Sequence, residues 1–381
     1  MLDSFLINSE IQKKWIKKFE TIEDTFKERA AYNDIHSSFP FENIEWLVNE
    51  GYSLLTLPVE YGGEGATIED MVVLQSYLGS LDGATALSIG WHLSVVGQLY
   101  EQHMWDEAML KQFADDIRNG ALVNRAVSEA DTGSPTRGGR PATHATKTEN
   151  GYKLNGVKTF TSMSKALTYY IVAAYVDDIE EVGFFLVPRE LKGVEIADNW
   201  NMVGMRATES HDLVLNDVYL PFENFVEGKR KPQPNGWILH IPSTYLGIAQ
   251  AARDYAIGFA KQHSPNSIKG TIAELPTVQQ NVGKMESLLL SSRHFLWSTA
   301  KGYQTINENP NVWNETSASK ILVMNQGLEV IDLAMRIVGA KSLEMDRPLQ
   351  RYYRDMRAGL HNPPMEDAAY TNIAKSVLGL F

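Results

Sequence analysis

At the centre of the chain, residues 170–176 read Tyr-Ile-Val-Ala-Ala-Tyr-Val, a short run of β-branched, aromatic and small side chains bounded by turn-forming residues. Two similar runs follow, Phe-Phe-Leu-Val at 184–187 and Leu-Val-Leu at 213–215. Short apolar segments of this kind predict strands. Asn150-Gly151 and Asn155-Gly156 suit tight turns, because both central residues of a type I′ turn need positive φ. The middle of the chain is therefore predicted to be a β domain.

On both sides of this region the spacing of apolar residues changes to three and four, which is typical of helices. The segment 62–134 contains no proline, and its apolar residues follow that spacing. After Pro242 two long apolar stripes cover 278–296 and 321–338. Gly339 stands directly after the second stripe, where a glycine commonly ends a helix. Helices are therefore predicted before and after the β domain.

These patterns predict an α+β fold with three parts: an N-terminal helical domain over 1–122, a middle β domain over 123–230 and a C-terminal helical bundle over 231–381. With 381 residues and 44% hydrophobic composition, the chain is long and apolar enough to bury a large core. Several positions of the C-terminal helices are apolar outside a single stripe. These helices are therefore expected to pack on more than one neighbour, either within the chain or in a second subunit.

The composition argues against several classes of protein. The 35 basic and 47 acidic residues give a net charge of −12 without a dense basic run, so no nucleic-acid partner is expected. The chain has no cysteine, which rules out disulfides, thiolate zinc sites and thiol nucleophiles. Its nine histidines lack the spacing of metal ligands, so no metal is expected. No signal peptide or membrane span is recognisable, and a cytoplasmic location is expected.

Two segments at the edges of the predicted β domain carry groups suited to a ligand. Residues 128–134 hold hydroxyls, carboxylates and a glycine, which offer short donors to a planar polar ligand or a phosphate. An ordinary polar loop between domains is the alternative. Residues 158–162 place Phe160 beside hydroxyls at a strand end. Phe160 either covers the face of a cofactor ring or follows the alternation of a half-buried strand.

The order of these features resembles the acyl-CoA dehydrogenase flavoprotein family, whose members combine a helical domain, a β domain and a second helical bundle. Six segments look like motifs of that family and occur in its order. They are Pro-Val-Glu-Tyr-Gly-Gly-Glu-Gly at 58–65, Ala-Val-Ser-Glu-Ala-Asp-Thr-Gly-Ser at 126–134, Asn-Gly-Val-Lys-Thr-Phe-Thr-Ser at 155–162, Gly-Met-Arg-Ala-Thr at 204–208, Leu-Val-Leu-Asn-Asp-Val-Tyr-Leu-Pro at 213–221 and Tyr-Arg-Asp at 353–355. Each motif is weak alone, and together they span most of the chain.

The resemblance implies a bound FAD, with FMN as an alternative cofactor. It implies that the first segment lines the flavin, or the thioester end of the substrate, through backbone and hydroxyl donors. The residues implied there are Val127, Ser128, Gly133 and Ser134. It also implies that Phe160 covers one flavin face, while Thr161 and Ser162 hydrogen-bond the reactive edge. Donors at that edge stabilise the negative charge that reduction places on the ring.

In the C-terminal bundle, the resemblance places contacts to the adenine and pyrophosphate of a neighbouring subunit's FAD. Arg336 stands where members carry a glutamine before a Gly-Gly pair, and Gly339 is the first residue of the corresponding pair. Arg336 is either a phosphate contact or an ordinary surface charge. The segment 261–267 has no arginine where members carry one for the pyrophosphate. The choice between FAD and FMN therefore stays open.

The catalytic base is where the chain departs most from the family. Most members carry a glutamate six residues after the arginine that is Arg357 here, and that position is Pro363. A second subgroup carries its glutamate near the position of Trp237, which is not acidic. His361, in a Leu-His-Asn-Pro turn, resembles a histidine of the family's flavin monooxygenase branch, or it caps a helix end. Glu366 is the nearest carboxylate, either a replacement base or a helix-dipole partner.

These considerations predict a flavin-dependent oxidoreductase acting on CH–CH donors, with α,β-dehydrogenation of an acyl-CoA thioester in fatty acid metabolism as its activity. A two-component monooxygenase that takes reduced flavin from a separate reductase is the first alternative. A catalytically idle homologue kept for binding or assembly is the second. The expected partners are an acyl-CoA or other small-molecule substrate and an electron acceptor or flavin reductase. The resemblance also implies a homo-oligomer, either a tetramer or a dimer.

Overall fold

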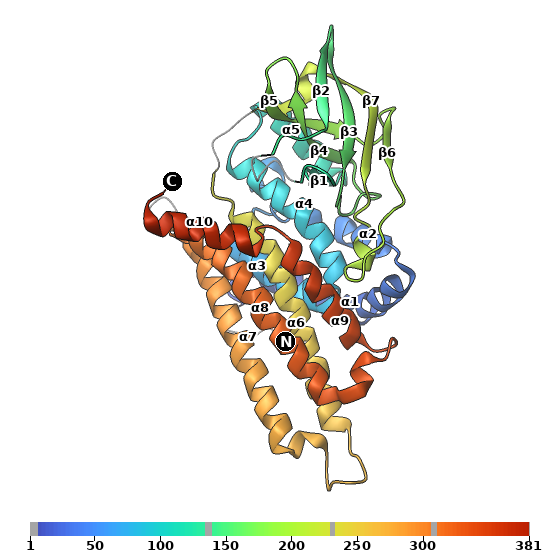
Figure 1. The fold of residues 1–381 in the computed structure, drawn as a ribbon, viewed down its shortest axis with the longest axis vertical. Coiled ribbons are helices and arrows are strands. Elements are labelled where there is room, and N and C mark those ends of the chain that lie inside the picture. The colour runs from blue at the N-terminus through green and yellow to red at the C-terminus, as the bar shows by residue number, and fades with distance from the viewer. Residues whose placement is uncertain (1–6, 134–138, 229–232, 306–310, 381) are drawn as a thin grey trace.

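The computed structural model describes residues 7–133, 139–228, 233–305 and 311–380. A β domain lies at one end of the molecule, and helices from both halves of the chain pack together beneath it (Figure 1). The helices of the N-terminal half are α1 (Glu10–His36), α2 (Phe41–Asn49), α3 (Ile68–Leu81), α4 (Gly83–Glu101) and α5 (Glu107–Arg118). The predicted α+β arrangement of helical part, β domain and helical bundle is confirmed.

Side chains just outside two of these helices explain where they begin. Ser9 accepts a hydrogen bond from the N–H of Gln12, whose side chain bonds back to the N–H of Ser9. Thr67 and Asp70 form the same reciprocal pair at the start of α3. Each pair satisfies backbone donors that have no partner inside the helix. Both helix starts are therefore specified locally by the sequence.

The β domain is one eight-stranded sheet. In chain order its strands are β1 (Val123–Ala126), β2 (His144–Thr148), β3 (Gly151–Lys158), β4 (Tyr169–Val176), β5 (Glu181–Pro188), β6 (Val194–Ile196), β7 (Leu213–Pro221) and β8 (Phe225–Glu227). Seven of them lie in the spatial order β6-β7-β3-β2-β4-β5-β8, and β1 pairs with β4. The three predicted strand segments lie in β4, β5 and β7, so these predictions are confirmed.

Two strands share one edge of β4. β1 pairs in parallel with residues 169–172 of β4, and β2 pairs in parallel with residues 175–176. The chain between Ala126 and His144 therefore leaves that edge and returns to it. Because β1 and β2 do not pair with each other, this segment can form a loop at the edge of the sheet without interrupting a ladder.

The two predicted turns have different outcomes. Glu149 and Asn150 form the two-residue connection between β2 and β3, so this turn lies one position earlier than predicted. The prediction for Asn155-Gly156 is wrong, because both residues lie inside β3 at a bulge opposite β7. A Cβ on Gly156 would lie 2.4 Å from the Thr143 hydroxyl oxygen. This glycine is therefore required by the close approach of a neighbouring segment.

The C-terminal half forms the helical bundle. It contains a short 3-10 turn, η7 (Gly236–Leu239), followed by α6 (His240–Gln262), α7 (Pro276–Gly302), α8 (Val312–Val338), α9 (Pro348–Ala358) and α10 (Glu366–Leu378). The predicted stripes lie in α7 and α8, and Gly339 is the C-cap of α8 with φ +70°. Both predictions are confirmed. The part of the chain described by the structure contains no helix that combines the length and apolarity required to span a membrane.

Helices α3 and α6 join the two halves of the chain at a close crossing. A Cβ on Gly79 would lie 2.4 Å from the Thr244 carbonyl oxygen, and one on Gly247 would lie 2.2 Å from the Ser76 carbonyl oxygen. Both neighbours are backbone atoms, which cannot move without shifting a helix. The absence of side chains at these positions therefore sets the distance between α3 and α6.

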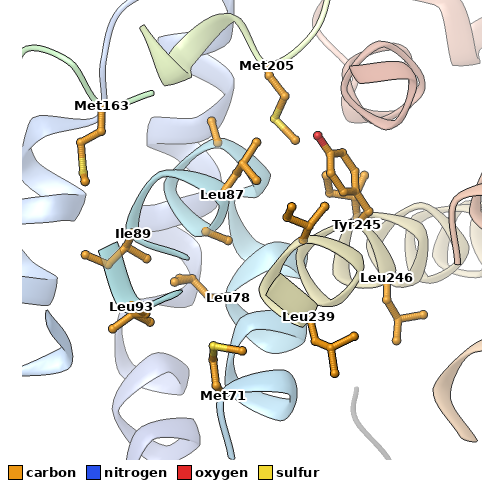
Figure 2. Close-up of a cluster of buried hydrophobic side chains, with 14 of the residues drawn as sticks. Met71, Leu78, Leu87, Ile89, Leu93, Met163, Met205, Leu239, Tyr245 and Leu246 are labelled. Atoms are coloured by element: carbon orange, nitrogen blue, oxygen red, sulfur yellow. The ribbon is translucent and has the colours of Figure 1, made fainter. Parts of the chain in front are cut away.

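A continuous core fills the space between this crossing, α4 and the β domain. Figure 2 shows ten labelled members of it, none more than 4% exposed. They are Met71, Leu78, Leu87, Ile89, Leu93, Met163, Met205, Leu239, Tyr245 and Leu246. Met163 and Met205 come from the β domain, and Met205 points toward Tyr245 of α6 (Figure 2). The β domain is therefore packed on the helices through a shared buried core.

His92 links α4 to the first strand. Its Nδ1 accepts the N–H of Val123 at 3.1 Å, so Nε2 carries the proton, and it donates to the Ser53 carbonyl at 3.0 Å. The ring is fully buried. Burial lowers the pKa of His92 to about 4, although the bond to Ser53 acts in the opposite direction. The imidazole is therefore neutral in the folded protein near neutral pH.

This lowered pKa predicts a loss of stability in mild acid. The unfolded state takes up a proton below about pH 6.5, while the folded state resists protonation down to about pH 4, so stability falls over that window as the pH falls. From pH 7 to pH 5, His92 accounts for about 2 kcal/mol of lost unfolding free energy. Urea titrations at both pH values should show a fall smaller by about that amount in His92→Gln. An equal fall in both proteins would contradict the assignment.

Candidate functional site

The loop after β1 is closed by its own backbone and tied to the end of β3. Glu129 and Gly133 exchange two backbone hydrogen bonds, of 2.9 and 3.1 Å. The N–H of Thr159 donates to the Ser128 carbonyl at 2.8 Å. Val127 and Ser128 are half-buried, and Gly133 is exposed with φ +72°. The predicted site residue Ser134 lies outside the described residues.

A buried ion pair holds this loop against the sheet. Lys158 Nζ lies 2.7 Å from Glu129 Oε1, with side chains 0% and 4% exposed. Glu129 also accepts the N–H groups of Ala142 and Thr143 at 2.7 and 2.9 Å. Burial alone would raise the pKa of Glu129, but hydrogen bonds from Lys158, Thr132 and Thr143 outweigh it and lower the pKa to about 2. Glu129 is therefore ionised, and its carboxylate oxygens are hydrogen-bonded to groups within the protein.

The turn after β3 presents an exposed aromatic ring. Phe160 has φ +57° and is 58% exposed, and Met163 has φ +64°. Positive φ is unfavourable for bulky side chains and persists where the surroundings impose it. Backbone bonds from Thr161 to the His211 carbonyl, at 3.2 Å, and from Met163 to the Thr208 carbonyl, at 3.0 Å, impose it here. The rings of Trp200 and Phe160 form a T-shaped pair with 6.1 Å between their centroids.

Hydroxyl groups gather beside this ring. Ser210 donates to the Ser162 hydroxyl at 2.9 Å, and Thr208 lies 2.9 Å from Ser210. Thr159 and Thr161 have buried hydroxyl oxygens with no hydrogen-bond partner among the described residues. Buried hydroxyls are usually hydrogen-bonded, so Thr159 and Thr161 each have the capacity to bond a further group. Phe160, Thr161 and Ser162 are therefore brought together as a ring face with donors beside it.

The last candidate segment is the turn between α9 and α10. Asp355 accepts the Met205 N–H at 2.6 Å, which ties α9 to the β domain. Burial, then the nearby Asp34 carboxylate, raises the pKa of Asp355 to about 7. Lys320 Nζ of α8 donates to the Leu360 carbonyl at 3.3 Å, and burial lowers the pKa of this amine to about 8. The turn is therefore held from two sides.

The structure separates the two predicted catalytic residues on this turn. His361 is exposed. Glu366 is half-buried in the first turn of α10 and accepts a hydrogen bond from the side-chain amide of Asn325 at 3.1 Å. This places the Glu366 carboxylate against α8. Asn362, between them, accepts the Tyr245 hydroxyl at 3.3 Å.

Arg336 and Gly339 lie apart from the other predicted site residues. Helix α8 runs from beside α10 toward the end of the bundle remote from the β domain, and both residues stand at its far end (Figure 1). Arg336 is 67% exposed and pairs with Asp332 at 2.6 Å on the same helix. The fold of one chain does not bring them to Phe160, so any shared role requires a second subunit.

The sequence analysis does not predict a cavity of about 840 Å³ that lies at the C-terminal end of α4. Its described lining includes Ile68, Glu101, Pro234, Trp237 and Tyr303. Trp237 packs on Gly97, and its indole N–H donates to Glu101 Oε2 at 3.1 Å. No motif marks Glu101, because it is the last residue of a helix. Among the described residues there is no group of three or more His, Asp or Glu side chains placed to hold a metal.

Comparison with known proteins gives one consistent family. Three family models match the chain: "Acyl-CoA dehydrogenase, N-terminal domain" at 10–112, "Acyl-CoA dehydrogenase, middle domain" at 124–218 and "Acyl-CoA dehydrogenase, C-terminal domain" at 239–362. A Bacillus subtilis (strain 168) protein named "Putative acyl-CoA dehydrogenase YdbM" is 51% identical over 374 residues, covering 97% of this chain and 98% of its own length.

Solved structures share the whole fold at lower identity. Butyryl-CoA dehydrogenase from Megasphaera elsdenii superposes with a TM-score of 0.87 at 19% identity, covering 97% of this chain and 99% of its own. KijD3 in complex with FMN and a dTDP-linked amino sugar gives a TM-score of 0.86 at 21% identity, covering 98% and 95%. Because the family models cover most of the chain and the Bacillus relative nearly all of it, the chain belongs to the acyl-CoA dehydrogenase family.

Proposed function

We propose that the protein binds a flavin against the Phe160 turn and catalyses the α,β-dehydrogenation of an acyl-CoA thioester. The observation that supports this most is the exposed Phe160 ring, held at positive φ beside unpaired hydroxyls, in a chain that belongs to a dehydrogenase family. An exposed ring in a strained turn is stable only where the surroundings impose it, and ligand sites are where such strain occurs.

The residues at this turn fit a flavin. Phe160 offers a ring face, Thr161 an unpaired hydroxyl, and Ser162 a hydroxyl that already accepts from Ser210 and therefore has its own proton free to donate. Ser128 and Val127 border the same turn, because the Thr159 N–H donates to the Ser128 carbonyl. A bound flavin supplies a two-electron acceptor for a hydride. FMN and FAD both remain candidates, and Arg336 and Gly339 of a second subunit are the contacts proposed for the adenine half of FAD.

An exposed apolar surface supports the proposed oligomer. A cavity of about 380 Å³ lies between α7, α8 and α10, and aromatic and aliphatic side chains dominate its lining. Val377, Leu378 and Leu380, at the C-terminal end of α10 and just beyond, are 78%, 68% and 65% exposed. Exposed apolar side chains that are grouped in this way suit a subunit contact. We propose that the protein forms a tetramer or a dimer. We also propose that it works with an electron acceptor or a flavin reductase and that it is located in the cytoplasm.

A second candidate is a monooxygenase that uses reduced flavin. Two observations favour it: Pro363 occupies the place of the family's base, and His361 is exposed on the turn while Glu366 is engaged by Asn325. KijD3, with the same fold, binds FMN and an amino sugar nucleotide. The fold therefore also serves a ligand that is not an acyl thioester.

Anaerobic titration of the flavin-loaded protein with acyl-CoAs of increasing chain length distinguishes the dehydrogenase from the monooxygenase. The dehydrogenase is expected to lose the visible absorbance of oxidised flavin and to form the enoyl product in equal amount. A protein that keeps its colour with every acyl-CoA, binds reduced flavin more tightly than oxidised flavin, and consumes oxygen would establish the monooxygenase. His361→Ala should then block oxygen-dependent product formation.

Thr161→Val tests the placement of the flavin itself. The change removes a buried hydroxyl that has no partner among the described residues while keeping the shape of the side chain. The flavin-free protein should therefore keep or slightly gain stability, whereas flavin binding should weaken by about 1–3 kcal/mol. Calorimetric titration of flavin into both proteins measures this. Thr146→Val, which removes a hydroxyl bonded to Asp177 on β2, is the matched control. Equal affinities in all three proteins would place the flavin elsewhere.

A further inference from the structure

The proposed dehydrogenation needs a base, and the turn between α9 and α10 supplies a poor one. The α-proton of a thioester is weakly acidic, so a side chain must take it as the β-hydride leaves. Pro363 has no basic group, and Glu366 faces Asn325 on α8. A carboxylate that opens into a ligand-sized cavity is the chemical requirement.

Glu101 meets this requirement. It is exposed to solvent at the end of α4 and lines the cavity of about 840 Å³. Oε2 is held by the indole N–H of Trp237 at 3.1 Å, and Tyr303, which donates to the Pro234 carbonyl at 3.0 Å, stands on the same wall. The carboxylate is therefore oriented while part of it stays open to a ligand.

The electrostatics of Glu101 suit proton transfer. Although one side of Glu101 is open to solvent, partial burial of its carboxylate raises its pKa, while hydrogen bonds from Trp237 and Tyr303 act in the opposite direction, and the net shift is upward. A carboxylate with a raised pKa holds an abstracted proton better than an ordinary surface carboxylate. Lysine and arginine do not occur among the described lining residues of the cavity.

The C-terminal end of α4, which carries Glu101, is tied to β1, the strand that leads into the loop bordering the Phe160 turn. Met104, three residues after Glu101, has its Sδ 3.5 Å from Arg125 Nη2. Arg125 leads through β1 into Val127 and Ser128. Glu227 joins the same corner, because it accepts from both Arg125, at 2.9 Å, and Trp105, at 3.1 Å. The end of α4 and the start of the loop are thus fixed together.

From this juxtaposition we propose that Glu101 is the general base of the dehydrogenation, an inference that rests on the function proposed above. The Cα–H bond breaks and its proton goes to the Glu101 carboxylate. The Cβ–H bond breaks, and a bound oxidised flavin would accept its electron pair as hydride. The electron pair of the Cα–H bond becomes the second bond between Cα and Cβ.

The decisive experiment follows proton removal without any redox step. Acetyl-CoA has α-hydrogens and no β-carbon, so the protein can exchange its methyl hydrogens with D₂O but cannot dehydrogenate it. Proton NMR should show exchange in the native protein and a fall of about 10²–10⁴-fold in Glu101→Gln. Calorimetry should give an acetyl-CoA affinity within about threefold of the native value, because Gln keeps the size of Glu. Glu101→Asp should retain part of the exchange.

Controls separate this inference from the proposed function. Glu107→Gln changes an exposed carboxylate of α5 and should leave exchange unchanged. Exchange that persists in Glu101→Gln and disappears in Glu366→Gln would overturn the assignment of the base. If the native protein neither exchanges acetyl-CoA nor bleaches with longer acyl-CoAs, the dehydrogenation itself is wrong. Bleaching by the native protein and by Glu101→Gln at equal rates would refute only the role of Glu101.

Discussion

Lys158→Met is expected to lower the free energy of unfolding by about 3–5 kcal/mol, because it leaves a buried carboxylate without its cation. Lys158 and Glu129 are 0% and 4% exposed and meet at 2.7 Å. Glu129 also binds two backbone N–H groups at the start of β2, so its charge cannot turn to solvent without opening the loop. The loop that borders the Phe160 turn should loosen, and flavin affinity should fall with stability.

Urea unfolding and flavin titration of the same variant check both effects. Lys153→Met is the matched control, since Lys153 pairs with Asp217 on the exposed side of the sheet. The double variant Lys158→Met/Glu129→Gln should recover part of the loss, because the second change removes the uncompensated charge. A Lys158→Met protein as stable as the control would show that the pair is not ionised in the folded state.

Gly247→Ala is expected to destabilise the protein by about 3 kcal/mol or more, although alanine is the better helix former. The added methyl carbon would lie 2.2 Å from the Ser76 carbonyl oxygen and 2.7 Å from the Ser80 nitrogen. Both are backbone atoms of α3, so the two helices must separate along their crossing. Tyr245 and Trp237, positioned by α6 and the turn before it, would move with them.

Thermal denaturation of Gly247→Ala and of a control variant, Gly258→Ala, measures the effect of the added methyl group. Gly258 lies on the same helix, and a Cβ there would meet nothing within 4 Å. Gly258→Ala should therefore stabilise the protein by about 0.5–1 kcal/mol through helix propensity alone. If both alanine variants shift the midpoint in the same direction, the crossing is not limited by the backbone contact.

The sequence predicts the elements well where one local pattern decides the structure. The apolar runs at 170–176 and 184–187 became β4 and β5, and Gly339 ended α8 as its position indicated. Asn155-Gly156 predicts a turn, yet it lies at a bulge in β3, because the same dipeptide suits both structures. Only the approach of Thr143 shows that Gly156 serves packing rather than chain reversal.

Only part of the candidate site can be predicted from the sequence. Phe160, Thr161 and Ser162 are consecutive, so one strand end brings them together and local reasoning finds them. Glu101 and Trp237 are far apart in the chain, and their 3.1 Å contact depends on how α4 packs against the start of the bundle. Nothing near either residue in sequence encodes that contact, because a helix end carries no spacing pattern.

The shared edge of β4 has a consequence for how this protein can diverge. Because β1 and β2 occupy successive parts of one edge, residues 169–172 and 175–176, the chain between Ala126 and His144 begins and ends within a few residues of the same line. Insertions or deletions between Gly133 and Ala142 interrupt neither the strand pairings nor the residues that Glu129 binds, so the cost of changing the length there is mainly loop-closure entropy, which grows slowly. Natural drift, or a laboratory exchange of this segment between relatives, can therefore change the surroundings of the proposed flavin site while the scaffold stays the same.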